Sequence, residues 1–101
     1  VMTSASTYSA AEIFAMSMRQ RANTVLVGEA TAGGFSDGLN KSLPHGTIFS
    51  LSNEFYLTPD NEEFEGDGVP VDIEQAFFTL EQREQGNDLG LEKAQAWIIQ
   101  Q

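Results

Sequence analysis

The stretch TYSAAEIF, from Thr7 to Phe14, decides the fold, because a short strand gives way there to a helix. Before it, Val1 to Ser4 has the apolar character of the end of a strand, and small residues follow that let the backbone bend sharply. After it, residues on one face recur at intervals of three and four, which predicts a helix from about Ser9 to Ala22.

The next segments extend this unit. TVLVGE, Thr24 to Glu29, is apolar and largely β-branched, which is typical of a strand buried on both faces in a parallel sheet. Strand, helix and strand form a βαβ unit, whose crossover is expected to be right-handed. Phe49 to Leu57 alternates with a period of two, which predicts a half-exposed strand, while Phe35 to Leu43 fits strand or loop. With a last helix expected from about Asp88, the sequence predicts an α/β fold.

Composition excludes several classes of function. The 101 residues carry 15 acidic and five basic side chains, a net charge of −10, which repels phosphate backbones, so we expect no nucleic-acid partner. The chain has no cysteine, and therefore no disulfide and no thiolate nucleophile. No apolar run approaches the roughly 20 residues of a membrane span.

Ser9 has two interpretations. SAAE, Ser9 to Glu12, has the spacing of a capping box, and from the local pattern alone capping is the favoured role. A nucleophile at this place is compatible with capping, since the amino end of a helix stabilises developing negative charge. The amide of Ala10 would then point at an oxyanion.

The motifs taken in order resemble those of one family, the C-terminal processing peptidases and their tricorn-core relatives, which are serine peptidases with a ClpP/crotonase-like fold. The matching stretches are TYSAAE (7–12), GEATAG (28–33), LPHG (43–46), EGDGVPVD (65–72) and GNDLGLEKA (86–94). None is specific alone, but five in the right order are hard to obtain by chance. The resemblance implies a partial ClpP/crotonase-like domain in which residues 1–101 are the C-terminal part of one peptidase catalytic domain. The upstream half and any PDZ-like domain would lie outside it, an expectation that the start at Val1 without an initiator Met also suggests.

The resemblance also assigns roles. Ser9 would be the nucleophile, the Ala10 amide would help to hold the oxyanion, and Glu65 would help to orient the catalytic groups, with Glu63 and Asp67 close enough to be confused with it. Where the bacterial processing branch has a Lys base, this chain has Gly34. The tricorn-like branch instead implies a His and a further oxyanion amide upstream of this chain.

Two other basic side chains are weak candidates for that base. His45 lies in the LPHG turn, where an exposed polar residue is expected, and Lys41 is expected to be a surface residue. The acidic stretch DNEEFEGDG lacks the spacing of a calcium loop at Phe64, and ATAGG does not fit a nucleotide-binding loop, so we expect neither metal nor cofactor.

We therefore expect a serine endopeptidase that acts on peptides or protein C-termini through an acyl-enzyme, and an isolated chain that is inactive. The alternative is a non-catalytic binding module of the same fold for hydrophobic ligands or peptides. Strand edges left open would favour self-association. The family resemblance suggests an exported, periplasmic or cell-envelope protein.

Overall fold

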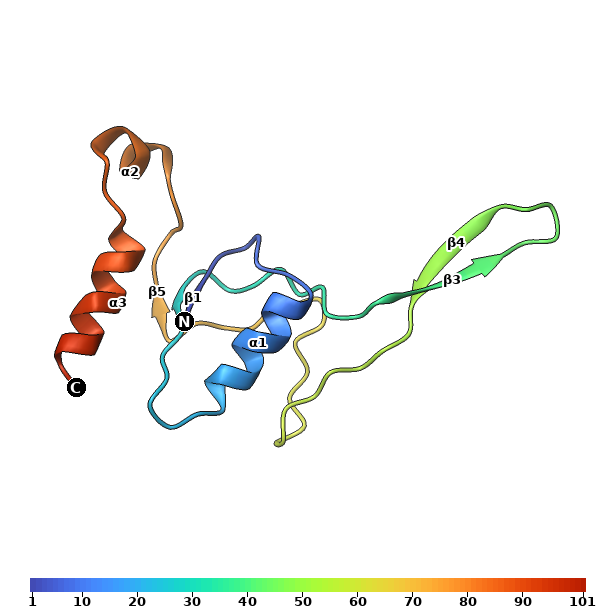
Figure 1. Cartoon of the computed structure of the whole chain (residues 1–101), viewed down its shortest axis with the longest axis horizontal. Helices are drawn as coiled ribbons and strands as arrows, with labels where there is room; N and C mark the ends of the chain where they lie inside the picture. Colours follow the sequence, from blue (N-terminus) through green and yellow to red (C-terminus); the bar gives the residue numbers. More distant parts are fainter.

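The computed structural model describes all residues, Val1–Gln101. Three short parallel strands form its main sheet, which lies between the first and last helices in the view of Figure 1. They are β1 (Met2–Thr3), β2 (Val27–Gly28) and β5 (Ile73–Glu74), in the order β1-β2-β5. Their register pairs Met2 with Val27, and Val27 with Ile73. Because both pairs of neighbouring strands are parallel, the loops that follow the three strands leave from the same edge of the sheet.

Helix α1 (Ala10–Arg19) connects β1 to β2, so the predicted βαβ unit and the α/β class are confirmed. The helix ends three residues before the predicted Ala22. Met16 is its last buried residue, and residues 20–23, which would form the next turn, are all exposed. Instead, the Gln20 amide closes the helix on the Ser17 and Met18 carbonyls, and the chain turns toward β2.

The strand predicted over Thr24 to Glu29 is shorter than expected. Leu26 and Val27 are buried, with 0% and 1% of their surface exposed, as a strand covered on both faces requires. The Leu26 amide, however, donates to the Asp72 carboxylate (2.8 Å) rather than to a neighbouring strand. A side chain thus takes the place of a ladder hydrogen bond, and regular pairing is limited to two residues.

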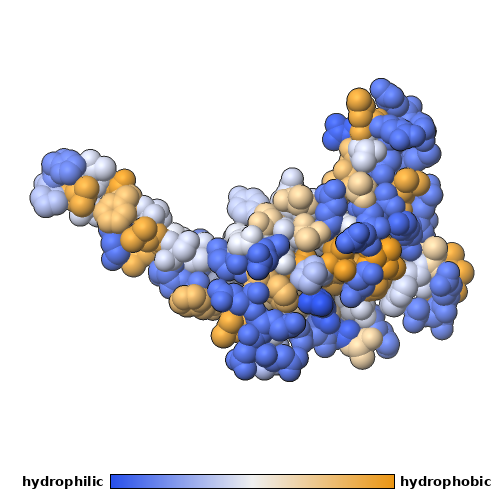
Figure 2. Space-filling model, turned by 180° about the vertical axis from the view of Figure 1, so that it is seen from behind, coloured by the Kyte–Doolittle hydropathy of each residue, from blue (hydrophilic) through white to orange (hydrophobic).

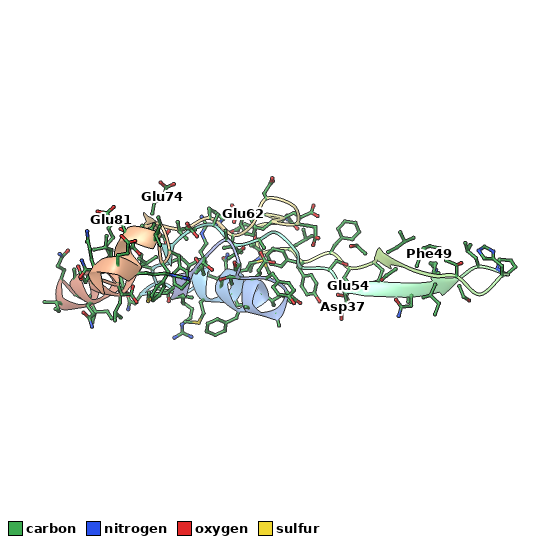
Figure 3. All side chains as sticks on the ribbon, turned by 90° about the horizontal axis from the view of Figure 1, so that it is seen from above. Asp37, Phe49, Glu54, Glu62, Glu74 and Glu81 are labelled. Atoms are coloured by element: carbon green, nitrogen blue, oxygen red, sulfur yellow. The ribbon has the colours of Figure 1, made fainter.

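The segment between β2 and β5 forms a β-hairpin that projects from the rest of the chain (Figure 1). Its strands are β3 (Gly38–Ser42) and β4 (Ile48–Ser52), and the predicted LPHG turn joins them, with the Gly46 amide donating to the Leu43 carbonyl (2.9 Å). Figure 3 places Phe49 along this arm and Asp37 and Glu54 at its base.

Two details of the strand prediction over Phe49 to Leu57 are wrong. The strand ends at Ser52, because the next two amides, of Asn53 and Glu54, both donate to the Ser36 hydroxyl (3.0 Å each). It is also exposed on both faces rather than on one, since nothing packs against either side of the arm. Figure 2 shows apolar side chains along the uncovered arm.

The core is small and lies between α1, β2 and the loops around them. It consists of six buried side chains, Ala15, Met16, Leu26, Phe35, Phe64 and Val69. Because Phe64 and Val69 belong to this core, the EGDG stretch between them lies against α1, the helix that follows Ser9. The core therefore fixes the two segments that the sequence associates with catalysis.

Two helices complete the chain. The predicted last helix is confirmed as α3 (Leu89–Ile99), with the Asp88 side chain accepting from the Leu91 amide (2.9 Å). Before it comes a helix that the sequence analysis did not predict, α2 (Leu80–Gln85), which Thr79 caps and a left-handed Gly86 ends. None of the three helices is long and apolar enough to cross a membrane.

Candidate active site

Ser9 occupies a strained turn at the start of α1. Its backbone has φ 58° and ψ −127°, a conformation that residues other than glycine rarely adopt and that costs on the order of 1–3 kcal/mol. Two hydrogen bonds from its amide hold it there, to the Gly34 carbonyl (3.0 Å) and to the Glu12 carboxylate (3.1 Å). The surrounding structure thus keeps a serine in a conformation that it would otherwise leave.

Ser9 and Glu12 form the predicted capping box, but its two halves differ in strength. The Ser9 amide donates to the Glu12 carboxylate, whereas the contact from the Glu12 amide to the Ser9 side chain falls short of a hydrogen bond. The Glu12 amide donates to the Ser9 carbonyl instead (2.9 Å). The hydroxyl is consequently not committed to capping, and both roles expected of Ser9 are open to it.

Glu12 does more than cap the helix. Its side chain is fully buried, and its carboxylate also accepts from the Thr31 hydroxyl, the Gly33 amide (2.6 Å) and the Gly34 amide (2.8 Å). With the Ser9 amide, four donors converge on one carboxylate, which joins the helix to the glycine-rich loop. Sequence reasoning assigned Glu12 only to the cap.

Thr31 was also missed, although it lies in the GEATAG motif. It is buried, and while it donates to Glu12 its hydroxyl accepts from the Val69 amide (2.7 Å). Thr31 therefore extends the network from Glu12 to the segment that follows EGDG. The available signal was its place in one of the five motifs that resemble the family.

The glycine-rich loop and the EGDG stretch are in backbone contact at Gly33. The Gly66 amide donates to the Gly33 carbonyl (2.7 Å), and a Cβ placed on Gly33 would lie 2.7 Å from the Gly66 carbonyl carbon. Gly33 also has φ 78°, which favours glycine. Only glycine fits this crossing, and the crossing brings Glu65 next to the loop.

Glu65 binds the backbone immediately after that loop. Its carboxylate accepts from the amides of Phe35 (3.1 Å) and Ser36 (3.0 Å). Neither Glu63, which lies in a β-bridge with Leu57, nor Asp67 makes such a contact. Of these three carboxylates, Glu65 is the one joined to the segment whose Gly34 carbonyl accepts from Ser9.

The amide of Ala10 is the first of α1, and no oxygen of the chain accepts a hydrogen bond from it, whereas the Ala11 amide already donates to the Tyr8 carbonyl (3.3 Å). Ala10 is exposed. An unbonded amide at the positive end of a helix can donate to an anionic oxygen.

No hydrogen bond joins the Ser9 hydroxyl to a side chain of the chain, and the Glu12 carboxylate accepts from the Ser9 amide. His45 lies in the turn of the projecting hairpin and Lys41 lies on β3, both exposed as predicted. A Cβ placed on Gly34 would meet only the Glu12 carboxylate, at 3.9 Å, which is ordinary van der Waals contact. No group of three or more His, Asp or Glu side chains is placed to hold a metal ion.

Comparison with known families identifies the family of the chain. Residues 1–75 match the model of peptidase family S41, and the chain therefore belongs to that family, a family of serine peptidases. No match was found among curated proteins.

Solved structures share the fold. A predicted peptidase from Parabacteroides merdae superposes with a TM-score of 0.77 and 28% identity, over 89% of this chain and 28% of its own. A lipoprotein from Streptococcus agalactiae gives 0.67 and 22% identity, over 95% and 29%. Mature CPAF gives 0.66 and 22% identity, over 76% and 15%. This chain thus spans less than a third of the length of each of these proteins.

Proposed function

We propose that the full-length protein containing residues 1–101 is a tricorn-like serine endopeptidase that cleaves peptides or protein C-termini through an acyl-enzyme. The observation that carries the proposal is the strained Ser9 at the start of α1, next to the unbonded amide of Ala10. Strain of this kind persists where the surrounding structure enforces it, and it concentrates at catalytic turns. Membership of a serine peptidase family supports the same reaction class.

The proposal assigns a role to each group. The Ser9 hydroxyl attacks the scissile carbonyl, and its proton passes to a base outside residues 1–101, for which the family resemblance suggests a His. The carbonyl oxygen becomes an anion and accepts from the Ala10 amide, a type of contact that typically contributes about 10²–10³ in kcat per donor. The proton then goes to the departing amine, and water hydrolyses the ester on Ser9.

Glu65 acts in this proposal as a positioning residue. Its carboxylate holds the Phe35 and Ser36 amides, and the preceding Gly34 carbonyl accepts from the Ser9 amide. Removal of the carboxylate would release the loop and, through it, the turn that carries Ser9.

Residues 1–101 are proposed to be the C-terminal part of the catalytic domain, so the isolated chain would lack the base and be inactive. An exported or envelope location is also proposed, in keeping with the family resemblance and with the lipoprotein among the similar structures. Fractionation of cells that produce the full-length protein would test it.

The test of the catalytic proposal is labelling of the full-length protein with a fluorophosphonate probe. We expect a single adduct on the peptide that contains Ser9, lost in Ser9→Ala and retained in Ser6→Ala, which changes an exposed serine of the same loop. A folded protein that gives no adduct would refute the proposal and favour a non-catalytic binding module.

A further inference from the structure

A second feature lies at the sheet edge from which the Ser9 loop departs. The three strands are parallel, so the loops after β1, β2 and β5 leave from the same edge, where open α/β sheets commonly bind ligands. These loops and α2 enclose an open cleft of about 490 Å³. Its lining residues are Ser4, Ser6, Glu29, Phe77, Phe78 and Arg83.

One wall of the cleft is an aromatic pair. Phe77 and Phe78 stand edge to face, with ring centroids 4.9 Å apart and planes at 73°. They are 45% and 42% exposed, although large apolar side chains are normally withdrawn from water. The Arg83 guanidinium lies over the Phe78 ring, 6.0 Å from its centroid, and supports it from the side of α2.

The backbone at Phe78 is strained as well. Its φ is 48°, and for a bulky residue a positive φ is a real outlier. The exposed apolar surface and the strained backbone both raise the free energy of this arrangement. Backbone strain held at a cleft is more common at binding and catalytic sites than elsewhere.

The cleft is within reach of a peptide bound at Ser9. Ser6 is three residues before Ser9, so even a fully extended backbone would place their Cα atoms no more than about 11 Å apart. A bound peptide in extended conformation advances about 3.3 Å per residue. The cleft can therefore receive the side chain of a substrate residue within about three positions of the scissile bond.

We propose that this cleft is a side-chain subsite that selects a large apolar residue, aromatic above all, close to the cleavage site. The inference rests on the proposed peptidase function and adds its specificity. Two exposed rings offer an edge and a face to a third ring, whereas the one carboxylate, Glu29, and the one guanidinium, Arg83, oppose each other in charge. Because the Glu29 carboxylate also accepts from the Ala5 amide (3.2 Å), it is already partly engaged.

The experiment is a positional cleavage profile of the full-length protein. The protein digests peptide mixtures, and mass spectrometry counts the products. The mixtures carry Phe, Leu, Ala or Glu at each of the three positions on either side of the cleaved bond. At one position we expect kcat/KM to favour Phe over Ala by roughly 10- to 100-fold. In Phe78→Ala that ratio should fall roughly tenfold, and Phe77→Ala should act in the same direction. The matched control is Phe55→Ala, which removes a Phe that is 82% exposed and outside the cleft.

A fluorophosphonate without a peptide side chain gives an independent readout of Ser9. Its labelling rate should be unchanged in the control Phe55→Ala, and circular dichroism of Phe78→Ala tests whether that variant is folded. If cleavage depends on Ser9 but the ratio of kcat/KM for Phe over Ala substrates is the same in Phe78→Ala as in the unaltered protein, the subsite alone is overturned. Absence of cleavage that depends on Ser9 overturns the proposed function and the subsite together.

Discussion

Replacement of Glu12 by Gln is expected to loosen the whole candidate site. Four donors converge on the Glu12 carboxylate, from Ser9, Thr31, Gly33 and Gly34. A Gln side chain keeps one carbonyl oxygen and turns an NH₂ group toward the other donors, so about two of the four hydrogen bonds are lost. Hydrogen bonds to a charged group contribute about 1.5–3 kcal/mol each, which gives a loss of about 3–6 kcal/mol. That is a large share of the roughly 5–15 kcal/mol that stabilises a typical domain.

Hydrogen exchange of the full-length protein, read by mass spectrometry over residues 31–36, measures this loss as a fall in the free energy of local opening. Glu84→Gln is the control, because Glu84 is an exposed glutamate in α2 without a side-chain hydrogen bond. Fluorophosphonate labelling of Ser9 should slow in Glu12→Gln and not in the control. If the free energy of local opening falls by less than about 1 kcal/mol, the network is refuted, because the loss of even one hydrogen bond to the carboxylate costs more than that.

Three further changes probe single contacts. Gly33→Ala should destabilise the fold by about 2–5 kcal/mol, because it adds strain at positive φ and a clash with the Gly66 backbone. Gly34→Ala should change stability by less than about 1 kcal/mol, and urea unfolding of the two variants measures the difference. Glu65→Ala should lower kcat by roughly 10- to 100-fold, whereas Glu65→Gln, whose oxygen still accepts from both amides, should retain most activity; equal losses would contradict a positioning role. The hydrogen bond from Tyr56 to the Glu54 carboxylate raises the pKa of Tyr56 above its usual value. The hydrogen bond therefore stabilises the folded state below about pH 10, and this stabilisation is lost as the pH rises through the raised pKa. Phenolate absorbance, as the difference from Tyr56→Phe, should show a lower pKa in Glu54→Gln, and an unchanged titration would contradict the assignment.

The elements that could be predicted from the sequence are those with a strong local pattern. Spacing located the helix that begins next to Ser9, and a β-branched run located the buried strand around Leu26 and Val27. Strand length could not be predicted, because it depends on partners distant in sequence, such as Asp72 at the Leu26 amide. The six residues of α2 are too few for a periodic pattern, and only Thr79 and Gly86 mark its ends.

The candidate site could also be predicted only in part from the sequence. Ser9 and Glu12 could be found from a four-residue spacing, and the family resemblance then gave Ser9 a proposed chemical role. The convergence of Thr31 and Gly33 on Glu12 could not be found, since it depends on a backbone crossing between Gly33 and Gly66 that no local pattern reports. The cleft beside the Ser9 loop likewise exists only because three parallel strands bring their loops to one edge.

The central claim is that Ser9 forms a covalent acyl-enzyme. The direct measurement is acid quenching of the full-length protein during turnover of a peptide, followed by tandem mass spectrometry of the fragment that contains Ser9. We predict an ester adduct on Ser9 with the mass of the amino-terminal product less one water, absent in Ser9→Ala. Cleavage by the unaltered protein with no adduct on Ser9, and with full activity retained by Ser9→Ala, would contradict the account.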